Sequence, residues 1–463
     1  MIKIKNNNLK SKNSDINNNE NYSKVYKQKS FLFFSKNIVR KNTKNIDEML
    51  KVPKDKELLA TLRNLDITYG HGFKAFRAVS DINLNIYKGE VLGLVGESGS
   101  GKSTIGKALV GLVPYSFGEI HLVNKLLPKK LYRGFKFGKA LKEYKEINNF
   151  LTNKVQMIFQ DPANSLNPHA NIEKIVSEGL VNTKNAKEIY LYNFDQNTKK
   201  EIYELLKKEN ENTNYFANDY EKQLDDDIKN SNQEIAFESL YIKLKNDIQN
   251  QQMLSEAISQ VFEEKTKIRN EITKISEKDA RKKLVIEILK QTGLDESILR
   301  RYPLEFSGGQ QQRIGISRSV VLRPELLIAD EPISALDVSI QAQVVNLFNE
   351  LKEKYDLTIL FIAHDLRMVE YISNRIAVMN KGRIVEIGST NEIMKNSFHP
   401  YTKSLLDAVP SIHGKKGSLV GYVYNPKIHK YTETNQPEWV KINDNHFVFA
   451  TKEEVEEWKT WKK

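Results

Sequence analysis

The chain has 463 residues, of which 40% are hydrophobic and 28% are charged, so it is long enough for two or three globular domains, or for one domain with large insertions. It contains no cysteine, which excludes disulfides, cysteine zinc sites and cysteine-held iron–sulfur clusters. Its 71 basic and 59 acidic residues give a net charge of +12, which is compatible with nucleic acid, an anionic membrane surface or a phosphate-bearing ligand. Lys and Asn abound throughout, and much of the excess lies in the first 56 residues, so the charge by itself selects none of these partners.

The N-terminal segment, residues 1–57, is rich in Asn and Lys and has few periodic apolar positions. This composition predicts a disordered or loosely helical extension. No apolar run approaches the roughly 20 residues that a membrane-spanning helix needs. The N-terminus also lacks the apolar stretch and small-residue cleavage site of a signal peptide, so we expect the chain to reside in the cytosol.

Short apolar runs separated by turn residues predict β-strands within 58–70 and 79–96. The later runs ELLIADEP (325–332) and LTILFIAHD (357–365) are continuously apolar, as strands buried on both faces are. Helical segments such as 339–355 separate the strands. The sequence therefore predicts an α/β fold with a mainly parallel sheet core flanked by helices.

A long segment between Gly179 and Gly293 contains neither glycine nor proline and abounds in Glu, Lys, Gln and Leu. Such a segment should be largely helical. Two groups of apolar residues recur in it at helical spacing, which predicts two amphipathic faces and a helical hairpin or small bundle. They are Phe237, Leu240, Tyr241 and Leu244, and then Leu254, Ile258, Val261 and Phe262.

The loop GESGSGKST (96–104) follows an apolar strand and precedes a helical pattern, which is the context of a P-loop. Its glycines let the backbone turn tightly, so that N–H groups point at one anion, and the following helix N-terminus adds partial positive charge. Lys102 can reach the β- and γ-phosphates of ATP, and the Ser103 hydroxyl can ligate Mg²⁺. The expected phosphate-binding residues are Gly96, Ser98, Gly99, Gly101, Lys102, Ser103 and Thr104.

Polar residues follow three further apolar runs. Asp330 and Glu331 end one of them, where Asp330 can hold the Mg²⁺ shell and Glu331 can polarise an attacking water. His364 ends the second run, and the carboxyl ends of strands are where open α/β sheets bind ligands, so His364 is a candidate γ-phosphate contact. Gln160 follows the third run, and its position alone assigns it no role.

These motifs, in this order, resemble the nucleotide-binding subunit of an ABC transporter over roughly residues 58–410. The stretch FSGGQQQR (306–313) is the most specific and resembles the ABC signature, whereas many NTPases share a P-loop. EPISALD resembles the segment from the catalytic acid to the D-loop and puts Asp337 at the D-loop position. The resemblance places Gln160 on the Q-loop and His364 on the H-loop. It implies a P-loop NTPase fold of ABC type, with an antiparallel β subdomain and a helical subdomain enlarged by an insertion.

The same resemblance implies roles for the site residues, with ATP and Mg²⁺ as cofactors. The catalytic residues implied are Glu331, His364 and Gln160, and the Mg²⁺ ligands implied are Ser103, Gln160 and Asp330. Tyr69 is the best candidate for the aromatic ring that stacks on adenine, and Phe76 is a weaker one. In the family the signature caps the γ-phosphate of a nucleotide bound to an opposing chain, using a helix N-terminus. The capping residues implied are Ser307, Gly308, Gly309 and Gln310.

Three stretches, 157–168, 301–310 and 399–410, are similar to the ATPases of oligopeptide/dipeptide importers. The pattern QDPxxSLNP resembles the F-type ATPases of the oligopeptide system, which work beside a D-type ATPase. This likeness implies an ATP-hydrolysing subunit that powers oligopeptide import and lies peripherally on the cytoplasmic face of the cell membrane. Its implied partners are a second ABC ATPase subunit, two permease subunits and an extracellular peptide-binding protein, with no nucleic acid.

The sequence departs from this family in three places. The stretch 121–154, between the P-loop and the Q-loop, is longer than usual in the family. The Gly- and Pro-free segment forms an insertion in the helical subdomain, at about residues 180–280. After residue 410 the family often has a Cys-containing tail, whereas 411–463 predicts a C-terminal extension with a short strand and a terminal amphipathic helix. A role in docking another subunit and a lineage-specific insertion without a function account equally well for this segment.

A soluble ABC ATPase acting on ribosomes or DNA is the alternative from a different class, with the basic tail and the insertion as nucleic-acid contacts. Such proteins usually carry two cassettes or a long coiled coil, whereas this chain has one P-loop and one signature. The same ATPase could also serve import of nickel or another small solute, because solute selectivity lies mainly in the binding protein and permease. Whether the opposing chain is a homologue or a second copy stays open at this point.

Overall fold

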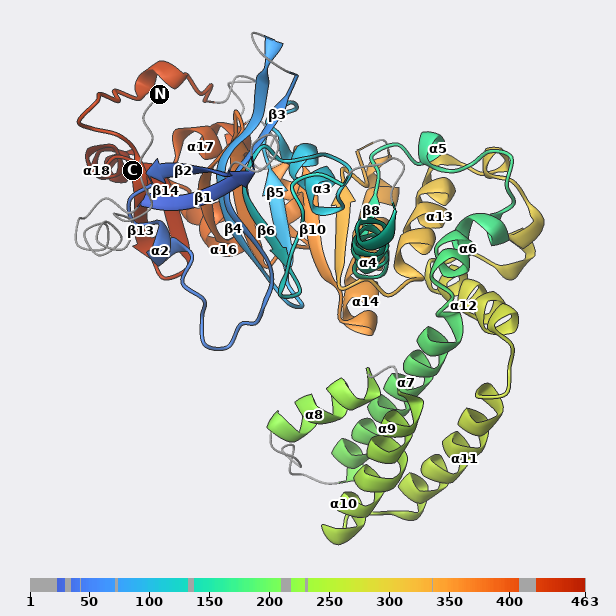
Figure 1. Ribbon diagram of the computed structural model, residues 1–463. Helices are drawn as coiled ribbons and strands as arrows, with labels where there is room; N and C mark the ends of the chain where they lie inside the picture. Colours follow the sequence, from blue (N-terminus) through green and yellow to red (C-terminus); the bar gives the residue numbers. More distant parts are fainter. Residues whose placement is uncertain are drawn as a thin grey trace. The chain divides into compact units, whose positions relative to one another are not determined.

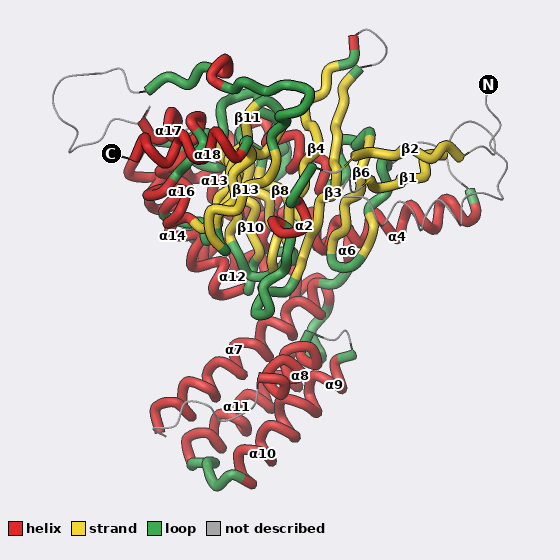
Figure 2. Tube along the Cα trace, turned by 90° about the vertical axis from the view of Figure 1, so that its left-hand side faces the viewer, coloured by secondary structure: helices red, strands yellow, loops and turns green. Residues whose placement is uncertain are grey.

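The chain folds into two compact units, one built on β-sheets and one helical (Figure 1, Figure 2). The computed structural model describes residues 23–29, 35–41, 43–70, 74–131, 137–209, 218–229, 232–334, 336–407 and 422–462. The first unit runs up to Asp161 and resumes at Pro324, and the second runs from Pro162 to Arg323.

An eight-stranded sheet forms the centre of the first unit, in the order β13-β14-β12-β11-β5-β10-β9-β8 (Figure 1). Its strands are β5 (Val91–Val95), β8 (Val155–Ile158), β9 (Leu326–Asp330), β10 (Thr358–Ala363), β11 (Arg375–Asn380), β12 (Arg383–Ser389), β13 (Glu438–Asn443) and β14 (His446–Ala450). The five neighbours from β11 to β8 pair in parallel, and the remaining pairs are antiparallel. The predicted mainly parallel core is therefore confirmed.

The parallel strands are buried on both faces because their sequences are apolar without alternation. Every residue of β5, β9 and β10 is buried. On one face Ile105 and Leu109 of α3 pack into a core that the second sheet shares. Successive strand residues point to opposite faces, and on the other face Phe361 of β10 meets Phe348 of α14 edge-on, with ring centroids 5.8 Å apart. The helices of this unit are α2 (Ile46–Met49), α3 (Lys102–Leu109), α4 (Gly138–Lys154), α14 (Val338–Tyr355), α15 (Leu366–Glu370), α16 (Thr390–Asn396), α17 (Pro400–Asp407) and α18 (Lys452–Lys459).

A second, antiparallel sheet has the strand order β4-β3-β6-β7 and confirms the predicted β subdomain. Its strands are β3 (Leu58–Tyr69), β4 (Phe76–Tyr87), β6 (Phe117–Leu122) and β7 (Lys125–Leu126). Leu62 and Leu84 are register partners on β3 and β4 and enter the core that also contains α3. The same register makes Tyr69 and Phe76 direct partners at the end of the hairpin where the loop connects β3 to β4.

The N-terminal segment differs from the disordered or loosely helical extension that its composition predicts. Its strands β1 (Ser23–Lys29) and β2 (Ser35–Lys41) pair antiparallel. Helix α2 buries Ile46 and Met49 in the core that contains Trp439, and the Trp439 N–H donates to the Lys44 carbonyl at 3.2 Å. These partners come from almost 400 residues further along the chain, so local composition could not reveal them. Residues 1–22 lie outside the described part of the chain.

The C-terminal extension contains one strand more than the sequence predicts. Both β13 and β14 are present, and β14 pairs with β12 and so joins the hairpin to the main sheet. The missed strand β13 is an edge strand in which only Trp439 is fully buried, so its apolar pattern is weak. The predicted terminal helix corresponds to α18. Residues 408–421, which include the end of the 399–410 stretch, lie outside the described residues.

The segment that lacks glycine and proline lies in the second unit, whose described residues are mainly in helices. They are α5 (Pro162–Ser165), α6 (Ile172–Thr183), α7 (Ala186–Glu209), α8 (Asn218–Ile228), α9 (Gln233–Phe237), η4 (Glu238–Lys243), α10 (Leu244–Asn250), α11 (Glu256–Ile272), α12 (Glu277–Gln291) and α13 (Gly308–Val320). The apolar residues that the sequence groups by helical spacing meet in one cluster, where Leu240, Leu244, Ile258 and Phe262 are buried.

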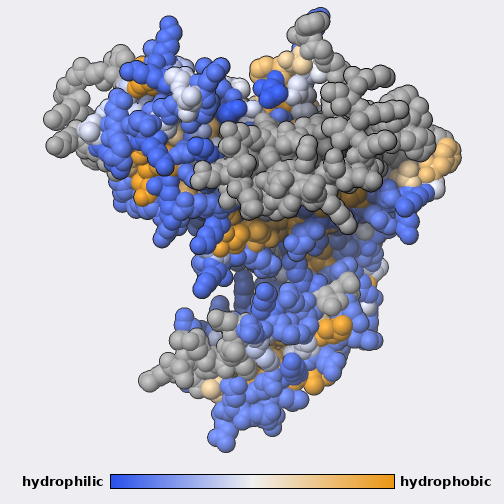
Figure 3. Space-filling model, turned by 60° about the vertical axis from the view of Figure 1, so that its left-hand side comes forward, coloured by the Kyte–Doolittle hydropathy of each residue, from blue (hydrophilic) through white to orange (hydrophobic). Residues whose placement is uncertain are grey.

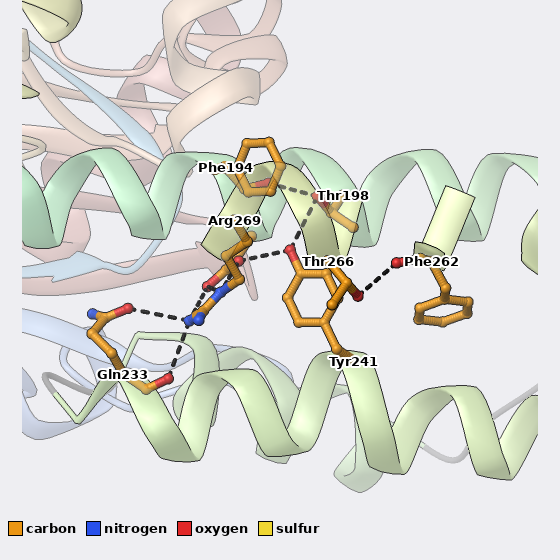
Figure 4. Close-up of polar contacts among 8 residues, drawn as sticks. Phe194, Thr198, Gln233, Tyr241, Phe262, Thr266 and Arg269 are labelled. Atoms are coloured by element: carbon orange, nitrogen blue, oxygen red, sulfur yellow. Dashed lines mark hydrogen bonds and ion pairs between the residues drawn. The ribbon is translucent and has the colours of Figure 1, made fainter. Parts of the chain in front are cut away.

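A buried ion pair crosses this helical cluster (Figure 4). Asp195 of α7 is fully buried and accepts hydrogen bonds from Arg269 Nε at 2.8 Å and Nη2 at 2.9 Å. The Tyr241 hydroxyl donates to the same carboxylate at 2.9 Å. The Gln233 carbonyl accepts from Arg269 Nη2 at 3.1 Å, so both charges have several polar partners. The pair thereby fixes how α7, α11 and the α9–η4 segment pack together.

Figure 3 shows that the described residues on this face are mainly hydrophilic, with scattered hydrophobic patches among them. In the described residues, no helix has both the length and the apolar character that crossing a bilayer requires.

Candidate functional site

The phosphate-binding loop predicted at 96–104 joins β5 to α3 in the first unit. A Cβ at Gly96 would lie 2.0 Å from the Met379 carbonyl oxygen, so the close approach of the two backbones requires glycine there. Gly101 has a φ of +102°, and a Cβ on it would lie 2.5 Å from the Ala78 carbonyl oxygen. Helix α3 starts directly afterwards, so its unpaired N–H groups lie at the end of the loop, as an anion site requires.

The Lys102 ammonium closes this loop. Its Nζ donates to the carbonyl oxygens of Gly96 at 2.7 Å and Glu97 at 2.9 Å, and the residue is only 3% exposed. Burial lowers the pKa of Lys102, while the negative charges of Glu331 and Asp330 counteract this shift. The cation therefore lies inside the loop, close to two acids.

Ser103 and Asp330, two of the predicted Mg²⁺ ligands, are in contact. The Ser103 hydroxyl donates to Asp330 Oδ1 at 2.6 Å. Burial raises the pKa of Asp330, and the hydrogen bond from Ser103 works against that rise. A hydroxyl and a carboxylate side by side are the hard oxygen donors that Mg²⁺ prefers, so these two residues fit the ion. Gln160, the third predicted ligand, contacts Glu331 instead.

The three predicted catalytic residues meet at the Glu331 carboxylate. Gln160 Nε2 donates to Glu331 Oε2 at 3.0 Å, and His364 Nδ1 lies 3.5 Å from the same oxygen. Glu331 and His364 also line a cavity of about 110 Å³. Glu331 has a φ of +44°, a strained conformation for a residue with a side chain, and its N–H donates to the Ile362 carbonyl at 3.0 Å. The backbone thus turns sharply after β9 and directs this acid toward Gln160 and His364.

Both candidate aromatics for adenine lie near the phosphate-binding loop. Tyr69 and Phe76 are cross-strand partners on β3 and β4, and both rings are exposed. The Tyr69 hydroxyl donates to Thr104 Oγ1 at 3.4 Å, which brings Tyr69 to the residue that follows Ser103. This contact with the loop makes Tyr69 the better candidate.

The signature residues lie in the second unit, at the start of α13. Ser307 caps the helix, accepting from the Gln310 N–H at 3.4 Å, while Gln310 Oε1 accepts from the Ser307 N–H at 3.1 Å. Gly308 and Gly309 form the first turn, and the space beside Gly308 is open. The buried Gln311 donates to the Pro303 and Phe306 carbonyls and so fixes the approach to the helix. A rigid helix N-terminus with small residues can bind an anion from outside the unit.

Asp337, the predicted D-loop residue, caps α14 in the first unit. It accepts from the Ile340 N–H at 3.0 Å and from the Ser339 hydroxyl at 2.6 Å. Hydrogen bonds from Ser339 and Ile340 lower the pKa of Asp337, so it is a carboxylate at neutral pH.

One residue at the site has no counterpart among the predicted site residues. The Glu97 N–H of the phosphate-binding loop donates to the Tyr401 hydroxyl at 2.9 Å. Tyr401 lies in α17 and is 1% exposed. It belongs to the HPYTKSLLDAVP stretch, whose likeness to importer ATPases carries no role for any one residue. The hydroxyl of a fully buried tyrosine usually has a hydrogen-bond partner, and this requirement is the only feature of Tyr401 that could have pointed to such a contact.

Two family models match this chain. Residues 79–334 match the model of the ABC transporter family, and residues 385–434 match the oligopeptide/dipeptide transporter C-terminal region. The chain is similar to the oligopeptide transport ATP-binding protein OppF of Streptococcus pyogenes serotype M1, with 40% identity over 87% of this chain and 98% of the relative.

Two further relatives agree. The oligopeptide transport ATP-binding protein AmiF of Streptococcus pneumoniae is 38% identical over 86% of this chain and 97% of its own length. The dipeptide transport ATP-binding protein DppF of Lactococcus lactis subsp. cremoris is 37% identical over 86% of this chain and 96% of its own length.

Proposed function

This chain belongs to the ABC transporter family, in the branch with the oligopeptide/dipeptide transporter C-terminal region, and we propose that it hydrolyses ATP to power oligopeptide import across the cell membrane. The observation that carries this proposal is the convergence of Gln160 and His364 on one oxygen of Glu331, beside the phosphate-binding loop. A carboxylate held by two polar neighbours at the end of a buried strand is suited to accept a proton from water.

The residues divide the work as follows. The loop N–H groups and Lys102 bind the β- and γ-phosphates, and Tyr69 stacks on adenine. Ser103 and Asp330 would hold Mg²⁺, with Gln160 as a third candidate ligand, and the ion when bound would supply positive charge that neutralises the phosphates. Glu331 orients the attacking water and accepts its proton, while His364 and Gln160 keep the Glu331 side chain in position and contact the γ-phosphate.

The signature requires a partner chain in this proposal. The Ser307 hydroxyl and the N–H groups of Gly308 and Gly309 cap the γ-phosphate of nucleotide bound to a second ABC ATPase subunit, a homologous D-type chain. Asp337 belongs to the same interface. Two such sites close together on ATP and open after hydrolysis.

Two permease subunits and an extracellular peptide-binding protein complete the proposed importer. The chain itself is peripheral on the cytoplasmic face of the membrane and is held there by the permeases. No role for nucleic acid is proposed.

Uptake of a labelled oligopeptide by cells tests this function. Deletion of the chain should abolish uptake, the wild-type chain should restore it, and Glu331→Gln should not. A competition panel of oligopeptides, dipeptides and Ni²⁺ identifies the solute class. Normal peptide uptake in the deletion strain, or recovery of the chain with ribosomes or DNA instead of membranes, would contradict the proposal.

A further inference from the structure

We propose that Tyr401 is a positioning residue that holds the phosphate-binding loop in its ATP-binding shape, through a hydrogen bond to the Glu97 peptide. The Glu97 N–H donates to the Tyr401 hydroxyl at 2.9 Å, and the Glu97 carbonyl accepts from Lys102 Nζ at 2.9 Å. The N–H of Glu97 is thus bonded to a residue outside the loop, Tyr401, and its carbonyl to a residue at the end of the loop, Lys102. This matters because residues 97–99 are exposed and form the tip of the loop.

Tyr401 is well placed to act as a fixed anchor. Its N–H donates to His399 Nδ1 at 3.1 Å, and the Ser404 hydroxyl donates to its carbonyl at 2.8 Å. Its ring meets Tyr424 edge-on with centroids 5.4 Å apart. Burial raises the pKa of Tyr401 to about 12, so the hydroxyl is neutral and available to the Glu97 N–H at any physiological pH.

The anchor is in turn supported by the C-terminal extension. The Tyr424 hydroxyl is 2.8 Å from His429 Nε2, and His429 Nδ1 is 2.7 Å from Glu454 Oε1 at the start of α18. The Trp458 ring packs edge-on against His399. A continuous set of packed and hydrogen-bonded side chains therefore joins α18 to the phosphate-binding loop. The residues 422–462, to which the sequence assigns no role, thereby acquire one.

Loss of the Tyr401 hydroxyl should weaken ATP binding without impairing the chemical step. A hydrogen bond to backbone is worth about 1 kcal/mol net, which corresponds to about a fivefold loss of ATP affinity if the freed loop must be reordered on binding. Tyr401 makes its hydrogen bonds with Glu97, His399 and Ser404, and not with Glu331, Gln160 or His364, so kcat should stay within about twofold of wild type while KM for ATP rises.

The test compares Tyr401→Phe with Tyr115→Phe in the full chain. Tyr115 is a matched control: it is buried, burial also raises its pKa to about 12, and its hydroxyl donates to a backbone carbonyl, that of Leu127, at 2.6 Å. Its bond lies in the β subdomain and does not involve the loop. Both variants lose one buried hydroxyl, so a general loss of stability affects them alike.

Two measurements are made on each variant: the Kd for Mg-ATP, by displacement of a fluorescent ATP analogue, and hydrogen exchange of the peptide that covers residues 96–101. We expect about three- to tenfold weaker ATP binding and faster loop exchange in Tyr401→Phe, with wild-type values for Tyr115→Phe. Equal behaviour of the two variants, or wild-type values for Tyr401→Phe, would overturn the inference.

The expected effect of Tyr401→Phe on ATP affinity rests on the proposed function. The experiments nevertheless distinguish failure of the proposed function from failure of the Tyr401 inference. If the wild-type chain and Lys102→Ala bind ATP equally poorly, the proposed function fails, while loop exchange still tests the Tyr401 anchor. If Tyr401→Phe does not fold, hydrogen exchange of the wild-type chain tests the inference instead. Its Glu97 amide should exchange slowly without nucleotide, and rapid exchange there would overturn the inference.

Discussion

Replacing Glu331 by Gln should stop hydrolysis while leaving ATP binding intact. The substitution keeps the size of the side chain and an oxygen that can accept from Gln160 Nε2, now 3.0 Å away, but removes the basic carboxylate. Lys102, which holds the phosphates in the proposed mechanism, makes its hydrogen bonds to the Gly96 and Glu97 carbonyls and not to Glu331. Affinity for Mg-ATP should therefore stay within about threefold of wild type.

The expected loss of rate follows from the role of a general base. Such a group contributes about 10²- to 10⁴-fold, which equals about 3 to 5 kcal/mol of barrier. Phosphate release by the assembled transporter measures kcat, and nucleotide displacement measures the Kd. Glu350→Gln, which removes the same charge from an exposed position on α14, serves as the control and should retain wild-type turnover. Turnover by Glu331→Gln within about threefold of wild type would refute the assignment of Glu331 as the base.

Three further predictions concern the phosphate site and the helical unit. Lys102→Ala should weaken ATP affinity about 10- to 100-fold in nucleotide displacement, because charge-assisted hydrogen bonds are lost; unchanged affinity would contradict the phosphate role. Ser103→Ala should raise the Mg²⁺ concentration for half-maximal ATPase activity about tenfold or more, and an unchanged Mg²⁺ titration would remove Ser103 from the ion site. Arg269→Met should lower the free energy of unfolding by about 3 to 5 kcal/mol in urea, because Asp195 is left buried and unpaired. Lys265→Met, which breaks a partly exposed pair with Glu201, should cost at most about 1 kcal/mol. An unpaired Asp195 has a raised pKa in the folded state, so the deficit of Arg269→Met should grow as the pH rises from 5 to 8, and a deficit that shrinks over that range would exclude this cause.

The sequence predicts the central part of the fold because that part depends on local pattern. The uninterrupted apolar runs at β9 and β10 can be satisfied only by strands covered on both faces. The glycines of the phosphate-binding loop are likewise required by local geometry, since Gly101 has a positive φ. The contact between Ser103 and Asp330 could be anticipated because both residues belong to motifs that predict ligands of one Mg²⁺ ion.

The sequence predicts poorly those features that depend on distant partners. The ordered α2 takes its burial from Trp439, and β13 is stabilised as an edge strand by β14. The bond between Glu97 and Tyr401 joins residues 304 positions apart. No spacing or periodicity encodes such a contact, because it depends on how α17 docks against the loop after both have formed.

The C-terminal extension illustrates what replaces covalent or metal constraints in a chain without cysteine. A terminal segment is ordered only if its burial compensates for its lost conformational entropy. Here Trp458 is 1% exposed, and its ring packs against those of His399, His429 and Trp461. His399 Nδ1 accepts a hydrogen bond from the Tyr401 N–H. The packing that orders the extension therefore also orders Tyr401, which anchors the phosphate-binding loop. Stability of the extension and affinity for ATP are therefore expected to change together, even though none of 422–462 belongs to the proposed nucleotide site.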